Sequence, residues 1–422
     1  MAVAWVRRLG SRRANHGRRQ KFAGAGPLRC QGKMLAGRRG TRHVGGMQRV
    51  GFVGWRGMVG SVLMDRLREE GELERIDARY FSTSAAGALG PDAQPLASAF
   101  DLDALAAMPV LVSCQGGGYT RKVYGPLRAS GWQGIWIDAA SALRMEPDTT
   151  LVLDPINRGG IDDALHAGVR TFAGSNCTVS LLLMAIAGLL RDWKELGVEW
   201  VQSSTYQAAS GAGAAQVQEL VAQWRILVGA VAPVLDDPTQ GVLELDRALS
   251  GALRSAELPT RALGYPLAAS LLPWVGDAKG DGRTEEEWKG HAEANKLLGL
   301  HGELPFDGMC VRVGAIRCHS QSVTVKFKAA LPLDEVEARL AASTPWTHVW
   351  ANDAESTRRA LTPASVSGTL DIAVGRVHRL RMGPEYLSLF TVGDQLLWGA
   401  AEPLRRMLNI LEAHGSRVGA GG

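Results

Sequence analysis

A glycine-rich turn between a strand and a helix is the feature that most constrains this fold. The segment "RVGFVGWRGMVGSVLMDRLREEG" begins with apolar residues typical of a buried strand. Gly54, Gly57 and Gly60 follow at GxxGxxG spacing, and apolar residues then recur at helical intervals. Such a turn lets backbone N–H groups approach a phosphate at a helix N-terminus. The spacing alone is equally compatible with a strand–helix turn that binds no ligand.

Further strands alternate with helical patterns after this turn. Short apolar runs occur at 78–81, 110–112, 135–137 and 171–173, each followed by small or polar residues. This alternation predicts an α/β fold with a doubly wound parallel sheet of the Rossmann type. Ligands of such sheets bind outside the carboxyl ends of the strands.

The end of the second strand bears on the choice of cofactor. NAD-binding folds usually have Asp or Glu there, but this strand ends in Ser82, Thr83 and Ser84. Hydroxyl groups can donate hydrogen bonds to a 2′-phosphate, which a carboxylate would repel. The pattern favours NADP over NAD, although these residues alone are also typical of a polar turn.

Two further strand ends carry polar side chains. "PVLVSCQGGGYT" runs from a buried strand into Gln115 and three glycines. "GIWIDAASALRM" runs from another strand to Arg144, which is either a solvated charge or a grip for an anionic substrate.

A lone cysteine lies in "GSNCTVSLLLM", where Asn176 is a candidate N-cap and Cys177 falls in the first turn of an apolar helix. The helix N-terminus favours a thiolate, which predicts a lowered thiol pKa. The stretch is equally compatible with a buried structural cysteine.

The nucleophile interpretation requires a basic partner. "CVRVGAIRCHSQSVTVKFK" alternates apolar and polar residues over 310–328 and predicts two strand segments. They carry His319, a candidate acid/base for a thiol, and Arg312, a candidate clamp for a carboxylate.

The net charge of +5 comes from the N-terminal extension. Residues 1–46 hold twelve Lys or Arg and no acid, so the other 35 basic residues face 42 acidic ones and the remainder carries −7. The extension is expected to be disordered. We favour a start assigned too far upstream, before Met47, over a transit peptide and over an RNA-binding arm. The acidic body argues against nucleic-acid binding.

The five cysteines show neither CxxC pairs nor metal-ligand spacing, so we expect no disulfide and no metal site in a reducing, cytoplasmic setting. No apolar run is long enough to span a membrane.

From Met47 to about Leu411 the sequence resembles the aspartate-semialdehyde dehydrogenases of the Gram-negative bacterial type. The resemblance is carried, in the family's order, by "VGFVGWRGMVGSVLM", "YFSTS", "GWQGIWIDAASALRM", "GSNCTVSLLLM", "TYQAASGAGA", "EEEWKGHAEANK", "CVRVGAIRCHSQS" and "FTVGDQLLWGAAEPLRRML". The segment 85–99 departs from the family pattern, near the expected adenosine end of the cofactor.

The resemblance implies a fold like that of glyceraldehyde-phosphate dehydrogenase. An NADP-binding domain would comprise residues 47–176 and 393–422, and a mixed α+β catalytic and dimerisation domain residues 177–392. The final helix, expected to start near Asp394, would return to the first domain, and Pro403 would kink it or mark a junction.

The resemblance also implies roles for individual residues. Cys177 would be the nucleophile, His319 the acid/base and Gln207 an orienting group. Arg312 would bind the substrate carboxylate and Glu286 its amino group, although three adjacent glutamates leave the register open. Arg144 and Lys289 would hold phosphate, with Asn176 beside the thiol. Contacts with NADP(H) would come from Gly54, Arg56, Gly57, Met58, Val59, Gly60, Thr83, Ser84, Gln115, Ser210, Gly211 and Gln395.

The implied reaction is the NADPH-dependent reduction of L-aspartyl 4-phosphate to L-aspartate 4-semialdehyde by a homodimer, through a cysteine thioester. N-acetyl-glutamyl-phosphate reductases and glyceraldehyde-phosphate dehydrogenases share the domain plan and are the nearest alternatives. A non-catalytic NADP-binding protein would not need both Cys177 and His319.

Overall fold

The first sheet is fully parallel and carries the glycine-rich turn. The computed structural model describes residues 48–300 and 302–420; the extension at 1–46 lies outside the described residues. The strand order β3-β2-β1-β4-β5-β7-β6 reverses between β1 and β4, which confirms the doubly wound α/β prediction. The strands are β1 (Gln48–Val53), β2 (Ile76–Ser82), β3 (Ala97–Ser98), β4 (Val110–Ser113), β5 (Ile135–Asp138), β6 (Thr149–Val152) and β7 (Thr171–Gly174).

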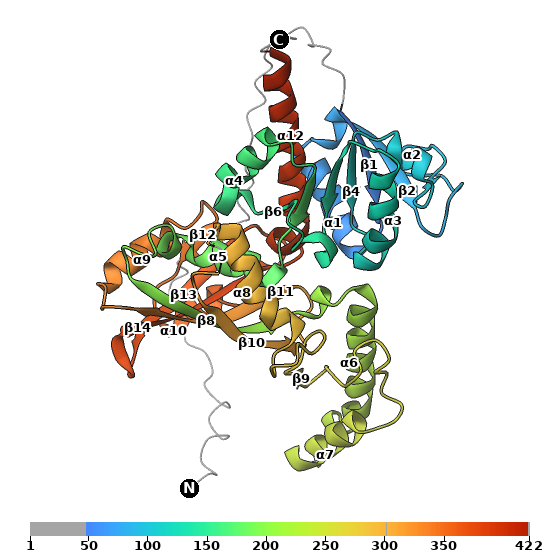
Figure 1. Ribbon diagram of the computed structural model, residues 1–422. Helices are drawn as coiled ribbons and strands as arrows, with labels where there is room; N and C mark the ends of the chain where they lie inside the picture. The colour runs from blue at the N-terminus through green and yellow to red at the C-terminus, as the bar shows by residue number, and fades with distance from the viewer. Residues whose placement is uncertain (1–47, 301, 421–422) are drawn as a thin grey trace, which may run out of the picture. The chain divides into compact units, whose positions relative to one another are not determined.

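Helices cover both faces of this sheet (Figure 1). Because side chains alternate along a strand, Phe52 packs with α1 and α12 on one face, whereas Val53 packs with α2 and α3 on the other. The elements are α1 (Met58–Glu69), η1 (Leu73–Arg75), α2 (Leu102–Ala106), α3 (Gly117–Ala129), η2 (Ser141–Leu143), α4 (Asp154–His166) and α12 (Glu402–Ala420).

The second sheet is mixed, with strand order β12-β13-β14-β11-β8-β10-β9. Its neighbours are antiparallel except for the parallel pairs β10–β8 and β12–β13. The strands are β8 (Val198–Gln207), β9 (Leu271–Leu272), β10 (Phe306–Val313), β11 (Cys318–Phe327), β12 (Thr347–Val349), β13 (Ile372–Leu380) and β14 (Gly383–Asp394).

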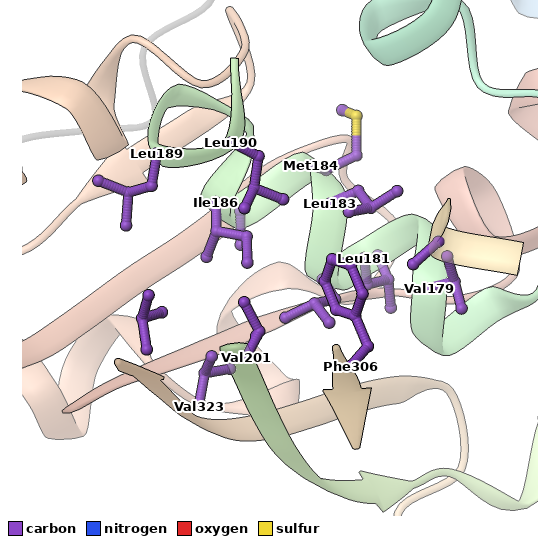
Figure 2. Close-up of a cluster of buried hydrophobic side chains, with 14 of the residues drawn as sticks. Val179, Leu181, Leu183, Met184, Ile186, Leu189, Leu190, Val201, Phe306 and Val323 are labelled. Carbon is purple, nitrogen blue, oxygen red and sulfur yellow. The ribbon is translucent and has the colours of Figure 1, made fainter. Parts of the chain in front are cut away.

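Helix α5 (Cys177–Leu190) forms the core above this sheet, and every residue from Thr178 to Leu190 is buried. Figure 2 shows its leucines, Ile186 and Met184 gathered with Val201, Val323 and Phe306 from the sheet. A helix that is apolar on all sides must be surrounded by protein. This burial fixes the helix start, and with it Cys177. The same face is covered by α8 (Glu285–Leu298) and α9 (Leu333–Ala341).

A helical arm follows β8 and has its own small core, which includes Leu220, Leu227 and Leu267. It consists of η3 (Ala209–Gly211), α6 (Ala214–Leu235) and α7 (Val242–Leu253). Two short helices, α10 (Ala354–Ala360) and α11 (Pro363–Val366), precede β13.

The C-terminal segment differs from its prediction. We expected a helix from near Asp394, but β14 runs to that residue and a π turn, η4 (Leu397–Ala401), comes before α12. Pro403 is the second residue of α12, directly after the π turn, so it marks the junction between these two helical segments. Buried ion pairs join α12 to the α1 region: Arg405 contacts Glu72 and Glu402, and Arg66 contacts Glu402.

No helix among the described residues is both long enough and apolar enough to cross a lipid bilayer.

Candidate active site

Cys177 and His319 lie together although 142 residues separate them in sequence. The thiol Sγ lies 3.2 Å from Nε2 of the imidazole. Cys177 begins α5, whose N-cap Asn176 accepts hydrogen bonds from the N–H groups of Thr178 and Val179. His319 is near the start of β11 and is 1% exposed. The structure therefore brings the predicted nucleophile and its predicted acid/base into direct contact.

The predicted direction of the thiol pKa is wrong for the free protein. Burial, and after it the nearby Glu286 carboxylate, raises the pKa of Cys177 to about 12, against the opposing effect of the cations Arg144 and Arg312. Burial, with Arg312, lowers the pKa of His319 to about 3. Loss of solvation outweighs the helix N-terminus here. At neutral pH the free pair is a thiol beside an uncharged imidazole.

The backbone of Ala208 fixes both His319 and Arg312. Its N–H donates to Nδ1 of His319 over 3.0 Å, and its carbonyl accepts from Nη1 of Arg312 over 2.7 Å. Because Nδ1 accepts a hydrogen bond, the neutral ring carries its proton on Nε2, which faces the thiol. A Cβ at Gly211 would lie 3.0 Å from Nη1 of Arg312 and 3.3 Å from Cε1 of His319, so this position has little room for a side chain.

The three adjacent glutamates lie in the first turn of α8, and each side chain has a different partner. Glu286 faces the site, and its Oε1 accepts from Nδ2 of Asn176 at 2.8 Å and from Nε2 of Gln207 at 3.2 Å. Glu287 instead forms a capping box with Thr284. Glu285 pairs with Lys289 at 3.1 Å. Of the three, Glu286 is the carboxylate that contacts Gln207 and Asn176.

Lys289 is turned toward carboxylates. Its Nζ lies 3.1 Å from Glu285 and 3.6 Å from Glu286. Its predicted phosphate contact therefore requires an anion that competes with these two acids.

Arg144 is held by a glutamate that the sequence analysis missed. Glu293, 1% exposed, accepts from Nη1 of Arg144 at 3.2 Å and from the backbone N–H of Asn176 at 2.6 Å. The guanidinium also donates from Nη2 to the carbonyl of Ala139, and its buried Nε has no partner. The available signal was spacing: Glu293 follows Glu286 by two helical turns and therefore lies on the same face of α8.

The glycine-rich turn leaves no room for side chains where it meets β4. Gly54 has a φ of +75°, and a Cβ there would lie 2.6 Å from the amide nitrogen of Gln115. A Cβ on Gly60 would lie 2.2 Å from the carbonyl oxygen of Gly54. Met58 and Val59 begin α1 directly after Gly57. The bare backbone beside a helix N-terminus fits a pyrophosphate group.

The second strand end adds a cation to this turn. Nη2 of Arg56 donates to Oγ of Ser82 at 3.1 Å, and the N–H of Ser84 donates to the same oxygen at 3.3 Å. Ser84 and Arg56 are exposed and Thr83 is half-buried. These groups form a cationic, hydroxyl-bearing rim at the end of β2.

Gln395, which directly follows β14, bonds to Ser210 of η3. Nε2 of Gln395 donates to Oγ of Ser210 at 2.6 Å, and both side chains are buried.

The sheet topology places the glycine turn and the residues around Cys177 along the same edge of the first sheet. The glycine turn follows β1, Gln115 follows β4, Arg144 follows β5 and Cys177 follows β7. These four strands are consecutive neighbours in a parallel sheet, so their carboxyl ends meet at one edge. The second sheet contributes His319, which contacts Cys177, Gln207, which donates to Glu286, and Arg312, which donates to the carbonyl of Ala208.

Comparisons with known proteins agree with this arrangement. Residues 49–164 match the family model described as "Semialdehyde dehydrogenase, NAD binding domain", and residues 189–398 match "Semialdehyde dehydrogenase, dimerisation domain". The solved aspartate semialdehyde dehydrogenase from Francisella tularensis is similar at 46% identity and a TM-score of 0.82, covering 87% of this chain and 100% of that one.

More distant structures share the fold. Aspartate semialdehyde dehydrogenase II from Vibrio cholerae matches at 20% identity and a TM-score of 0.69, covering 87% of this chain and 99% of that one. The enzyme from Candida albicans, solved with NADP, matches at 16% identity and a TM-score of 0.58 over the same shares.

Proposed function

The chain belongs to the aspartate-semialdehyde dehydrogenase family and is an enzyme of this kind with a nicotinamide-binding domain, and from this premise we propose its reaction and mechanism. The enzyme reduces L-aspartyl 4-phosphate to L-aspartate 4-semialdehyde with NADPH, and catalyses the phosphate-dependent oxidation in reverse. The observation that carries the proposal is the 3.2 Å contact between Cys177 and His319, at the sheet edge that also bears the glycine turn. The reaction serves the cytoplasmic aspartate pathway to lysine, threonine, methionine and isoleucine.

Catalysis proceeds through a thioester. The sulfur of Cys177 forms a bond to the acyl carbon of aspartyl phosphate, the thiol proton passes to a phosphate oxygen, the C–O bond to phosphate breaks, and inorganic phosphate leaves with that proton. The nicotinamide cofactor, when bound, supplies the hydride that reduces the thioester carbonyl. The resulting thiohemiacetal expels the Cys177 thiolate and releases the aldehyde. A thioester lacks the resonance donation of a carboxylate, so hydride addition to its carbonyl is the easier step.

His319 serves this chemistry as a hydrogen-bond donor. Because Ala208 donates to its Nδ1, the Nε2 proton points at the sulfur and stabilises a thiolate as it forms or departs. The same N–H group can donate a hydrogen bond to the oxygen of the tetrahedral intermediate. Burial and the positive charge of the adjacent Arg312 lower the pKa of His319, and a bound phosphate, being negative, would act in the opposite direction to that charge.

The charged side chains around the thiol match the charges of the substrate. Arg312 binds the α-carboxylate with the donors that Ala208 does not use. Glu286 binds the ammonium group, and Gln207 and Asn176, which already donate to Glu286, orient the acyl group. Arg144, held in place by Glu293 and the carbonyl of Ala139, supplies positive charge for the phosphate, and Lys289 joins it when the anion displaces the acidic partners of that lysine.

NADP is the preferred cofactor. Arg56 and the hydroxyls of Ser82, Thr83 and Ser84 offer donors to a 2′-phosphate, and no acid ends β2. The glycine turn and Gln115 accept the dinucleotide, and Ser210, Gly211 and Gln395 contact its nicotinamide end. The cofactor domain comprises residues 47–176 and 393–422, and the catalytic and dimerisation domain residues 177–392.

The functional form is a homodimer. One face of the second sheet is covered by α5, α8 and α9. On the opposite face of its central strands lie the ring pairs Trp200–Tyr386 and Tyr206–Phe390. Tyr206 is 39% exposed and Met309 on the adjacent β10 is 52% exposed, so an apolar area faces outward there. A second copy of the chain covers this face, in keeping with the name of the matching dimerisation domain.

One assay tests the reaction. The purified protein should reduce NADP when given L-aspartate 4-semialdehyde and phosphate together, and neither compound alone should suffice. Cys177→Ala should abolish turnover while NADP still binds. Turnover with N-acetyl-glutamate semialdehyde in place of the aspartyl substrate would support the sister reductase instead, and activity of Cys177→Ala would refute the covalent route.

A further inference from the structure

Gly399 lies directly against the nucleophile, in a segment that the proposed chemistry does not use. A Cβ built on Gly399 would lie 2.6 Å from the Cβ of Cys177 and 3.0 Å from its Cα. Carbon atoms that are not bonded do not approach so closely, so only glycine fits against the first residue of α5 in this arrangement.

Gly399 belongs to the π turn, η4. The N–H of Ala401 bonds to the carbonyl of Leu396 over 3.1 Å, five residues back, which is the π-helical pattern. A π turn contains one more residue per turn than an α-helix, so it changes which residue of the segment faces a neighbour. Turns of this type occur frequently at functional sites.

The turn is anchored on both sides. Trp398 is fully buried, and its indole N–H donates to the carbonyl of Leu370 over 2.8 Å. The carboxylate of Asp394 accepts from the N–H groups of Leu396 and Gly368 at 2.9 and 2.7 Å. On the other side, the Asn176 cap and the buried helix α5 hold Cys177. Neither side of the contact has room to retreat.

We propose that Gly399 is a positioning residue for the nucleophile: the π turn packs glycine backbone against Cys177 and thereby directs the thiol toward His319. The turn begins just after Gln395, whose Cβ would lie 3.3 Å from a Cβ at position 399. The segment from Gln395 to Gly399 therefore contacts the nucleophile and also carries Gln395, which is proposed to contact the cofactor. The catalytic consequence rests on the proposed role of Cys177, whereas the packing contact does not.

Gly399→Ala tests the catalytic consequence. Displacing the thiol by about an ångström should lower kcat at least ~100-fold, because covalent attack depends steeply on alignment. The KM for NADP should change much less than kcat, since the glycine turn is untouched and only Gln395 among the proposed cofactor contacts adjoins Gly399; alkylation of Cys177 by iodoacetamide should change in rate. Gly415→Ala is the matched control: it lies on α12, a Cβ there meets open space, and it should retain full activity.

A double-mutant cycle tests the contact itself without any assay of activity. Cys177→Gly removes the Cβ that an alanine at 399 would meet, so Gly399→Ala should lower the melting temperature much less in that background than in the natural one. Equal losses in both backgrounds would overturn the contact. Unchanged kcat in a folded Gly399→Ala enzyme would overturn the positioning role. If the natural enzyme lacks the proposed activity but the cycle shows coupling, the packing inference stands and the function fails.

Discussion

The amide N–H of Ala208 donates to Nδ1 of His319 over 3.0 Å, and this bond decides where the imidazole holds its proton. The neutral ring carries hydrogen on Nε2, directed at a sulfur 3.2 Å away. A doubly protonated ring would direct Nδ1–H against the amide hydrogen of Ala208. The site is therefore built to donate a hydrogen bond to sulfur or oxygen, and it disfavours storing a proton taken from the thiol.

The pH dependence of thiol reactivity follows from this arrangement. Because burial raises the pKa of Cys177 to about 12, its alkylation rate in the free enzyme should keep rising through pH 10, by about tenfold per unit. An ordinary thiol levels off near pH 8.5. Iodoacetamide labelling followed by mass spectrometry measures the rate at this cysteine, with Cys177→Ala as the blank. A plateau below pH 8 would mean that a thiolate–imidazolium pair exists before substrate binds.

Glu286 should act on the amino group of the substrate. Glu286→Gln keeps an oxygen for Asn176 or Gln207 but loses the charge, and kcat/KM for L-aspartate 4-semialdehyde should fall about 100-fold. Succinic semialdehyde lacks the amino group, so the same substitution should change its kcat/KM only slightly. An equal loss with both aldehydes would assign Glu286 to the geometry of the site and not to ammonium recognition.

Arg56 should govern the choice between NADP and NAD. Its guanidinium lies at the rim formed with Ser82, and Arg56→Ala removes the only cation there that contacts Ser82 among the described residues. The KM for NADP should rise about 10- to 100-fold, because the variant loses one or two charge-assisted hydrogen bonds to the 2′-phosphate. The KM for NAD, which lacks the 2′-phosphate, should hardly change. Steady-state kinetics with both cofactors separates this outcome from a general loss of binding.

Glu293 should matter for stability as well as for Arg144. Glu293→Gln leaves the buried Arg144 without its counter-charge, which should cost about 3 kcal/mol of unfolding free energy in urea titrations. Glu244 pairs with Arg247 on the exposed surface of α7, and Glu244→Gln should change the same quantity by less than about 0.5 kcal/mol. Similar values for the two variants would show that Arg144 finds another partner or water.

The α/β fold could be predicted from the sequence because it depends on local patterns, whereas the approach of Cys177 to His319, 142 positions apart, was expected from the thiol's need for a basic partner and from the family resemblance. Strand ends after apolar runs specify one sheet edge, and glycine spacing specifies the turn. The direction of the thiol pKa was wrong because a helix start is visible in sequence, whereas the depth of burial around it is not.

The register of Glu286 and the role of Glu293 were beyond the sequence for a different reason. Adjacent glutamates differ only in the direction in which their side chains leave α8. Which of them faces the site depends on how the helix packs against Asn176 and Arg144. The π turn was likewise invisible, since its extra residue is held by tertiary contacts such as that of Trp398 with Leu370.

Helix α12 covers one face of the first sheet with residues that are made long after its strands. Arg405 and Glu72 form their ion pair across 333 positions of sequence, and Leu404 and Met407 fill the apolar face that Phe52 and Leu63 present. During synthesis, that face therefore stays uncovered until Leu404 and Met407 have been made, about 340 residues later. An apolar surface that is exposed in this way is of the kind that makes folding intermediates prone to aggregation.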